Sequence, residues 1–194
     1  MKDQITQIFR ESIEAKRDFL EKNCSGLVAA VQVIIEAFRT GGKVLLFGNG
    51  GSAADAQHLA AEFVNRYKLD RPALPAIALT TDSSTITSIA NDVNFDEVFV
   101  KQIRALGKTG DIAIAISPSG NSVNVLRAVE CSRQMGLRTI GLTGGDGGEL
   151  GSLVDHSLCV SATNNTGRIQ EAHILIGHAM CEMVEETLYG CARE

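Results

Sequence analysis

Histidine, carboxylate and amide side chains recur at helical spacing in two otherwise apolar stretches of the sequence. His58 and Glu62 are four residues apart, and Gln170 and His178 are eight apart. At about 100° per residue, each pair falls on one side of its predicted helix. Imidazole and carboxylate groups are the side chains most often used for proton transfer near neutral pH. The two helices are therefore candidates for carrying an acid–base site.

Interconversion of an aldose and a ketose is one reaction that these groups suit. It passes through an enediol, so it needs a base near two adjacent carbons and an acid near the carbonyl and hydroxyl oxygens. A partly buried carboxylate is a stronger base than an exposed one, which suits a glutamate to the first role. Histidine exchanges protons near neutral pH, which suits it to the second role.

Other interpretations of the same residues stay open. Glu62 can pair with Arg66, one turn along the helix surface, and a single histidine on an apolar face is more often a hydrogen-bonded core residue. His58, Glu62 and His178 are also acceptable zinc ligands, with Gln170 an unusual fourth. Zinc would polarise a sugar carbonyl, but a glutamate bound to the metal would be a weaker base.

A serine-rich loop, Ser117-Pro118-Ser119-Gly120-Asn121-Ser122, separates an apolar run from a helical pattern. Its glycine permits a tight turn close to a ligand, and the following helix directs free N–H groups at the loop. The hydroxyl groups add donors that can rotate toward an oxyanion. A plain turn is the alternative, since these are common turn residues. The pattern favours a phosphate monoester bound without a lysine or arginine.

A second glycine-rich loop, Gly48-Asn49-Gly50-Gly51-Ser52, also joins an apolar run to a helical pattern. It permits close approach of a polar ligand, and Ser52 is a candidate N-cap. The chain contains neither GxxxxGK[ST] nor GxGxxG after a strand, so we expect no nucleotide cofactor.

Short apolar runs alternate with helical patterns along most of the chain. We expect strands at 43–48, 76–79, 112–116, 139–142 and 157–160, and helices at 52–67, 84–91, 95–106, 123–135 and 167–188. This alternation predicts a three-layer α/β fold with a parallel five-stranded sheet and helices on both faces. Ligands bind such sheets beyond the carboxyl ends of the strands, where both glycine-containing loops fall.

The first forty residues follow a helical pattern that Gly26 interrupts. We therefore expect an N-terminal helical hairpin, and a single domain over residues 1–194 with no internal repeat or linker.

Bulk composition excludes several classes of function. The 194 residues carry a net charge of −5 with no basic stripe, so nucleic acid is not expected as a partner. No apolar stretch is long enough for a membrane span, and the charged N-terminus lacks the apolar core of a secretory signal, which favours the cytoplasm. Five scattered cysteines are expected to be reduced thiols.

Taken together, these motifs resemble the sugar isomerase (SIS) domain family. The two loops carry the resemblance, and His58-Leu59-Ala60-Ala61-Glu62, Asn91-Asp92 and the segment from Arg168 to His178 narrow it to the phosphoheptose isomerases. The likeness covers nearly the whole chain. It implies a flavodoxin-like SIS fold, a homotetramer in which helices of residues 1–40 take part in assembly, and sites built from more than one subunit.

The resemblance also implies an activity and roles for individual residues. It implies conversion of sedoheptulose 7-phosphate to D-glycero-D-manno-heptose 7-phosphate for lipopolysaccharide or another surface glycan, with Glu62 as base and His178 as acid. It places on the substrate Asn49, Gly50, Gly51, Glu62, Asn91, Asp92, Ser117, Pro118, Ser119, Ser122 and Gln170. In metal-bound members the Zn²⁺ ligands match His58, Glu62, Gln170 and His178.

The sequence departs from the family pattern at two positions. Pro118 replaces the usual threonine and has no N–H to donate to a phosphate. Gly167 stands where some members carry an aspartate, so no role is expected there.

Two other classes share the fold. A replication-initiator-associating protein forms the same tetramer without catalysis and resembles the chain at 74–79, but it usually lacks the residues equivalent to Glu62 and His178, which are both present here. Sugar-phosphate-sensing regulators usually carry a DNA-binding domain, for which this chain has no room.

Overall fold

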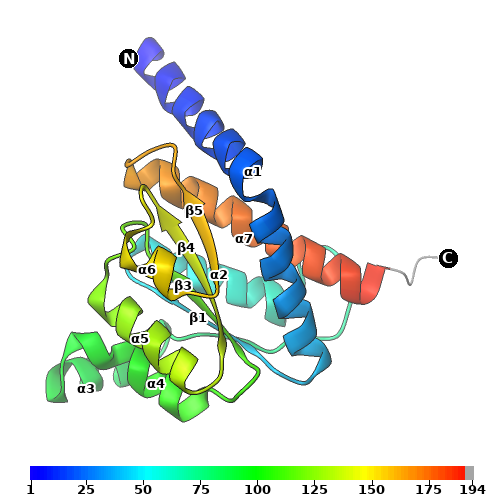
Figure 1. The fold of residues 1–194 in the computed structure, drawn as a ribbon, viewed down its shortest axis with the longest axis vertical. Coiled ribbons are helices and arrows are strands. Elements are labelled where there is room, and N and C mark those ends of the chain that lie inside the picture. The colour runs from blue at the N-terminus through cyan, green and yellow to red at the C-terminus, as the bar shows by residue number, and fades with distance from the viewer. Residues whose placement is uncertain (191–194) are drawn as a thin grey trace.

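The strands form one fully parallel sheet in the computed structural model, which describes residues 1–190 (Figure 1). Their order is β2-β1-β3-β4-β5, the flavodoxin-like order. This confirms the predicted parallel α/β sheet. The strands are β1 (Val44–Gly48), β2 (Ala76–Ala78), β3 (Ile112–Ile116), β4 (Arg138–Gly144) and β5 (His156–Val160).

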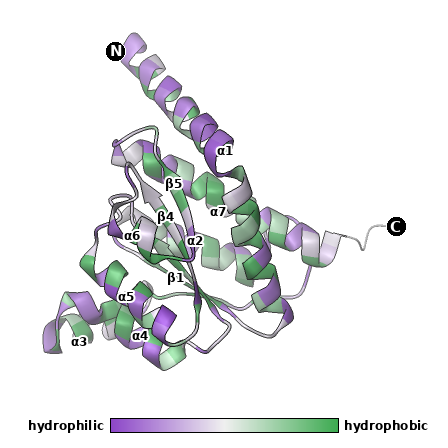
Figure 2. Cartoon of the chain, in the orientation of Figure 1, coloured by the Kyte–Doolittle hydropathy of each residue, from purple (hydrophilic) through white to green (hydrophobic). Residues whose placement is uncertain are grey.

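Two apolar cores lie on opposite faces of the sheet because strand side chains alternate in direction. Leu46 belongs to the core under one helical layer, whereas Leu45 and Phe47 belong to the other core. Figure 2 shows that the helices turn their apolar sides toward these two cores. The first layer contains α1 (Lys2–Arg39), α2 (Gly51–Val64) and α7 (Thr166–Tyr189), and the second contains α3 (Ser83–Asp92), α4 (Val98–Leu106), α5 (Val123–Gln134) and α6 (Gly148–Leu153).

The predicted N-terminal hairpin is wrong, because α1 is one continuous helix of 38 residues. A glycine inside a helix costs only about 1 kcal/mol relative to alanine, and there is no proline in the segment to stop the helix. Gly26 lies beside Leu158 of β5, so the helix passes over the sheet at this point. The N-terminal part of α1 extends beyond the rest of the molecule (Figure 1).

Three smaller differences concern two helix ends and one additional helix. Gly50, with φ +56°, is the N-cap of α2, and the Ser52 hydroxyl is buried without a partner, so the predicted serine cap is not formed. The predicted helix at 95–106 begins with a 3-10 turn, Phe95–Glu97, before α4. The short helix α6 was not predicted, because the glycine-rich segment around it looks like a loop.

The sheet brings the two glycine-containing loops together. β1 and β3 are paired along their whole length, with Gly48 opposite Ile116. The loops that follow them therefore leave the sheet side by side at its carboxyl edge, as expected for a ligand site. Across residues 1–190, no helix combines the length and apolar character required to cross a membrane. The described cysteines, Cys24, Cys131, Cys159 and Cys181, are free thiols, and Cys191 lies outside the described residues.

Candidate active site

A cavity of about 340 Å³ opens at the carboxyl edge of the sheet, between the two glycine-containing loops and the start of α7. It brings together eight of the eleven residues that the family resemblance places on a substrate. The cavity is lined by Asn49, Gly50, Gly51, Ser52, Ile116, Ser117, Pro118, Ser119, Ser122, Thr166 and Gln170.

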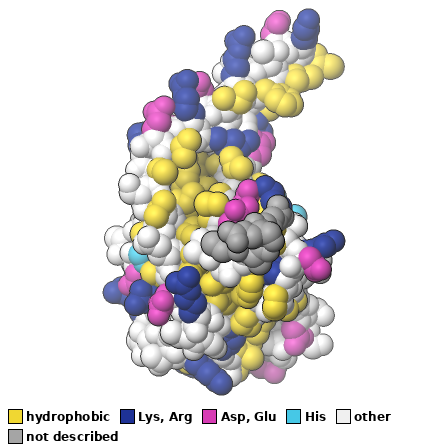
Figure 3. Space-filling model, turned by 90° about the vertical axis from the view of Figure 1, so that its right-hand side faces the viewer, with side chains coloured by type: hydrophobic (Ala, Val, Ile, Leu, Met, Phe, Trp, Pro, Cys, Tyr) yellow, Lys and Arg dark blue, Asp and Glu magenta, His cyan; other side chains and the backbone are white. Residues whose placement is uncertain are grey.

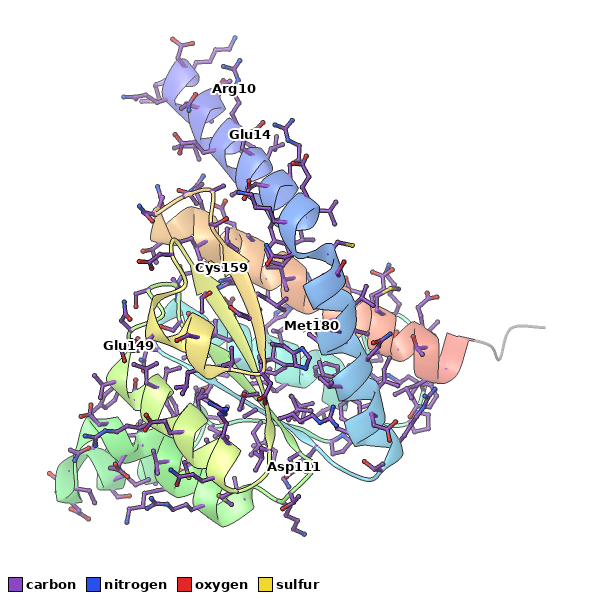
Figure 4. The ribbon with its side chains drawn as sticks, viewed as in Figure 1. Arg10, Glu14, Asp111, Glu149, Cys159 and Met180 are labelled. Carbon is purple, nitrogen blue, oxygen red and sulfur yellow. The ribbon has the colours of Figure 1, made fainter. Side chains whose placement is uncertain are left out.

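A second segment supports the serine loop. Gly120 has φ +67°, and its carbonyl oxygen accepts a hydrogen bond of 2.9 Å from the N–H of Leu150. Asn121 accepts a 3.0 Å hydrogen bond from the N–H of Glu149, a residue labelled in Figure 4. A Cβ on Gly120 would clash with the carbonyl of Gly147. The loop's shape therefore depends on residues 147–150, which the sequence did not indicate.

Gly120→Ala is expected to distort the serine loop and raise the KM for a sugar phosphate. The positive φ alone costs an alanine about 1–2 kcal/mol, and the clash with Gly147 adds to it. Gly41→Ala is the matched control, since Gly41 has φ +80° but a Cβ there meets nothing within 4 Å. Steady-state kinetics and thermal melts of both variants check this. Equal KM values for Gly120→Ala and the control would contradict it.

The amides of Asn49 and Asn124 join the two loops. Each side chain donates one hydrogen bond of 2.9 Å to the other. Asn124 is buried at the first turn of α5, directly after the serine loop. One N–H of the Asn49 amide is therefore committed to this pair, and the other is free for a ligand. The sequence did not single out Asn124, whose partner is 75 residues away.

The predicted acid–base residues meet on the outer side of α2 and α7. The Nε2 atoms of His58 and His178 lie 2.9 Å apart, so one ring donates to the other. His58 Nε2 is also 3.4 Å from a carboxylate oxygen of Glu62, and the Tyr67 ring lies 5.5 Å from the His178 ring, centroid to centroid. The Glu62 side chain is 24% exposed and that of His58 is 48% exposed. The cluster is thus open to solvent in a single chain.

Three residues predicted to contact the substrate do not line the cavity. Glu62 belongs to the cluster on α2 and α7, and Asn91 and Asp92 are hydrogen-bonded to each other at the exposed end of α3. Gln170 does line it, because its amide rests against Gly51, where a Cβ would lie 2.6 Å from its Nε2. Gln170 is thus packed at the start of α2, about two turns before His58.

Asp55 is a neighbour of the cluster that the sequence interpretation missed. It lies three residues before His58 on α2, which helical spacing alone could have indicated. One of its carboxylate oxygens is buried without a hydrogen-bond partner. Burial raises the pKa of the Asp55 carboxyl, and positive charge on His58 and His178 offsets part of that rise. Asp55 therefore adds a second carboxylate, besides Glu62, within electrostatic reach of the two histidines.

The cluster has the chemistry of a zinc site but not its arrangement. Two imidazole nitrogens and a carboxylate oxygen are ligands that zinc prefers, and these atoms of His58, His178 and Glu62 converge. The two rings nevertheless form a hydrogen-bonded pair. Within residues 1–190, no group of three or more His, Cys, Asp or Glu side chains has the geometry of a metal site.

His173 lies in the core between α7 and the sheet. It is fully buried, its Nε2 lies 2.9 Å from the Thr143 carbonyl oxygen, and its Nδ1 has no partner. Burial lowers the pKa of His173 to about 4, although the hydrogen bond to Thr143 acts in the opposite direction. His173 is thus a neutral packing residue.

We expect His173 to make folding stability depend on pH. Between pH 6.5 and about 4 the unfolded chain binds a proton at this histidine and the folded chain does not. Stability therefore falls as pH falls through this window, by up to about 3 kcal/mol. Urea unfolding at pH 7 and pH 4.5, at one protein concentration, should show a smaller pH effect in His173→Gln than in wild type. Equal pH effects would contradict this.

Comparison with known proteins relates nearly the whole chain to enzymes that share one name. A sequence model described as SIS domain matches residues 7–144. The phosphoheptose isomerase of Thermodesulfovibrio yellowstonii is 48% identical over 97% of this chain and 94% of its own length, and that of Roseiflexus sp. is 52% identical over 92% and 90%. The structure of phosphoheptose isomerase GmhA from Neisseria gonorrhoeae superposes with a TM-score of 0.88 at 42% identity, covering 95% of this chain and 98% of that one.

Proposed function

The chain belongs to the phosphoheptose isomerase family of SIS-domain proteins, and on that basis we propose that it converts sedoheptulose 7-phosphate to D-glycero-D-manno-heptose 7-phosphate through an enediol. Its family identifies it as a sugar-phosphate isomerase. The observation that carries the specific proposal is the meeting of Glu62 with two histidines on the same pair of helices that line the cavity.

The cavity suits the phosphate end of the substrate. Ser117, Ser119 and Ser122 supply hydroxyl donors, and the N-terminus of α5 supplies free N–H groups and the positive end of its dipole. Pro118 has no N–H to contribute, so the hydroxyl groups and the remaining N–H groups carry the binding. Asn49, Gly50 and Gly51 approach from the other loop.

The Glu62 and His178 pair suits the reacting end. Glu62 would take the proton from C1 of the ketose, the electron pair of that bond would form the C1=C2 double bond, and the C2 carbonyl oxygen would receive a proton from His178. Return of a proton to C2 and loss of one from the C1 oxygen completes the aldose. The contact between His58 and His178 supports this assignment, because it orients the imidazole that handles the oxygen protons.

Helix geometry supports a long substrate. His178 follows Gln170 by eight residues, or roughly 12 Å along α7 at 1.5 Å per residue. Helical side chains lean toward the N-terminus, so the acid–base groups incline toward the cavity. A span of roughly 12 Å is comparable to a seven-carbon chain that carries its phosphate at the far end.

Zinc is a candidate cofactor of this site. His58, Glu62, Gln170 and His178 would hold it, and the bound ion would polarise the sugar's oxygens. Glu62 would then be a weaker base. Metal analysis of protein purified without chelator decides whether the ion is present.

A homotetramer assembled through residues 1–40 is part of the proposal. Ile5, Phe9 and Ile13 follow one side of α1, and Phe9 and Ile13 are 66% and 62% exposed. Figure 3 shows apolar side chains gathered along this helix. A partner subunit would cover them, and the family resemblance implies that a further subunit also contributes to the site. The family resemblance further suggests a cytoplasmic enzyme that supplies a surface glycan such as lipopolysaccharide.

Charges placed on that apolar side are expected to break the assembly. Phe9→Glu with Ile13→Glu should sediment as a smaller species than wild type, because burying two unpaired carboxylates is costly. Glu14→Lys is the matched control, since position 14 lies about 140° around the helix from position 9. Glu14 is labelled in Figure 4. A wild-type protein that sediments as a monomer, or a double variant that stays tetrameric, would contradict the proposed interface.

A panel of ketoses tests the proposed reaction. Sedoheptulose 7-phosphate, fructose 6-phosphate and unphosphorylated sedoheptulose are offered to the wild type, with added zinc and after chelator treatment. We expect turnover of the heptose phosphate to an aldoheptose 7-phosphate, weaker turnover of the hexose phosphate and none of the free sugar. Absence of turnover in every condition would overturn the enzyme assignment in favour of a non-catalytic binding protein.

A further inference from the structure

A buried ion pair lies at the far end of the helices that carry the acid–base cluster. Arg71 Nε donates to a carboxylate oxygen of Glu185 at 2.9 Å, and both side chains are only 1% exposed. The same carboxylate accepts the backbone N–H groups of Tyr67, Lys68 and Leu69 at 2.6–3.0 Å. Every lone-pair direction of this buried charge is thus used, which such a charge requires.

Arg71 also forms hydrogen bonds with the C-terminus of α2. Its guanidinium donates to the carbonyl oxygen of Glu62 at 2.9 Å and to that of Phe63 at 2.7 Å. These belong to the last carbonyls of the helix, which have no partner within it. The arginine therefore holds the backbone of the residue whose carboxylate is the proposed base.

Glu185 connects the ion pair with α7, the helix that carries His178. It lies seven residues after His178, two turns along the same side of the helix. It also fixes the backbone of Tyr67, whose ring lies against the His178 ring. One carboxylate thus determines where both the histidine's helix and its aromatic neighbour lie.

Close packing along the rest of the two helices leaves little freedom. A Cβ on Gly51 would lie 2.6 Å from Gln170 Nε2, and one on Gly177 would lie 2.5 Å from the side chain of Leu59. The helices run side by side in one direction, in contact at their start, at their middle and, through Arg71 and Glu185, at their end. A shift of α2 against α7 at their C-terminal ends would therefore change the distances between the acid–base side chains that the two helices carry.

We propose that Arg71 and Glu185 are positioning residues that hold α2 and α7 in the register at which Glu62 and His58 meet His178. The inference rests on the proposed function for its kinetic consequences. Neither residue touches the cavity or the three side chains of the cluster directly. Their role is to hold the acid–base side chains in place, because a displacement of about 1 Å in such groups can lower the rate of the catalysed reaction roughly 100-fold.

Glu185→Gln and Arg71→Lys test the proposal. The first keeps the shape of the side chain and removes the charge. The second keeps the charge but loses the planar fork that reaches Glu62, Phe63 and Glu185 together. We expect kcat on sedoheptulose 7-phosphate to fall about 10- to 100-fold in both. We expect KM to change less than about threefold, because the phosphate cavity lies at the other end of the helices.

The matched control is Asp111→Asn. Asp111 is also a buried carboxylate that accepts backbone N–H groups, those of Lys43 and Lys108, and an ion pair from Lys43. It lies at the amino edge of the sheet, away from the candidate site (Figure 4). We expect it to lower Tm with kcat unchanged. The proposal is overturned if Glu185→Gln and Arg71→Lys, assayed well below their Tm, also keep the kcat of wild type.

A second readout does not depend on activity. In ¹⁵N spectra of metal-free, histidine-labelled protein, the Nε2 atoms of His58 and His178 should show their shared hydrogen bond in wild type and in Asp111→Asn, and lose it in Glu185→Gln. If wild type turns over no sugar phosphate but this pattern holds, the proposed function fails and the positioning role stands. A hydrogen bond retained in Glu185→Gln would refute the positioning role in either case.

Discussion

Glu62→Gln is expected to lower kcat for isomerisation by about 10²- to 10⁴-fold, the range of a lost general base. The amide has nearly the shape of the carboxylate, so packing beside His58 is kept, but it cannot accept the C1 proton. The KM should change little, because the phosphate is bound by the serine loop. Steady-state kinetics with sedoheptulose 7-phosphate measure the effect, and sedimentation shows whether the assembly is kept.

Glu182→Gln provides the comparison for this variant. Glu182 lies one turn beyond His178 on α7 and pairs with Lys68 at the surface, 2.6 Å from its Nζ. Surface pairs of this kind contribute little to stability, so both kcat and Tm should match wild type. Activity of Glu62→Gln close to that of wild type would mean that another group is the base.

His178→Asn is expected to lower kcat by about 10²-fold or more, because the acid that serves both oxygens is removed. His58→Asn should cost less, about 10-fold, since it removes only the partner that orients the His178 ring. The difference in kcat between the two variants separates the proton transfer proposed for His178 from the orientation of its ring by His58.

The zinc content of the two variants distinguishes His178 as a proton donor from His178 as a zinc ligand. Both variants should be analysed for bound zinc alongside their kinetics. If His58→Asn and His178→Asn lost activity equally, and lost zinc in the same proportion, the two histidines would be equivalent ligands. The assignment of His178 as the acid would then be wrong.

Short apolar runs made most of the fold predictable. The strand at 112–116 was placed without error and the others within two residues at each end, because buried parallel strands are continuous apolar runs. The helical hairpin failed for a physical reason. The cost of Gly26 in a helix is smaller than the stabilisation from packing α1 across α7 and β5, and that packing depends on tertiary structure.

The candidate site was predictable where its residues are close in sequence or share a helical face. The serine loop and the pairs His58–Glu62 and Gln170–His178 follow from local spacing. The contact between His58 and His178 joins residues 120 positions apart, and Arg71 and Glu185 are 114 apart. Nothing in local spacing signals such contacts, because they arise from the way α2 and α7 lie on the sheet.

The same limit applies to Asn91 and Asp92. Family resemblance placed them on the substrate, whereas in the single chain they pair with each other and do not line the cavity. Their proposed role, like the covering of the open cluster, would therefore require the proposed assembly of subunits through α1.

Turnover of sedoheptulose 7-phosphate by the wild type in D₂O, followed by ¹H NMR, tests the central claim most directly. Transfer through an enediol predicts an aldoheptose 7-phosphate with deuterium at C2, since protons held by the base exchange with solvent. Glu62→Gln should form no such product over the same period. A ketose signal that stays unchanged with the wild type, in the presence and absence of zinc, would contradict the account.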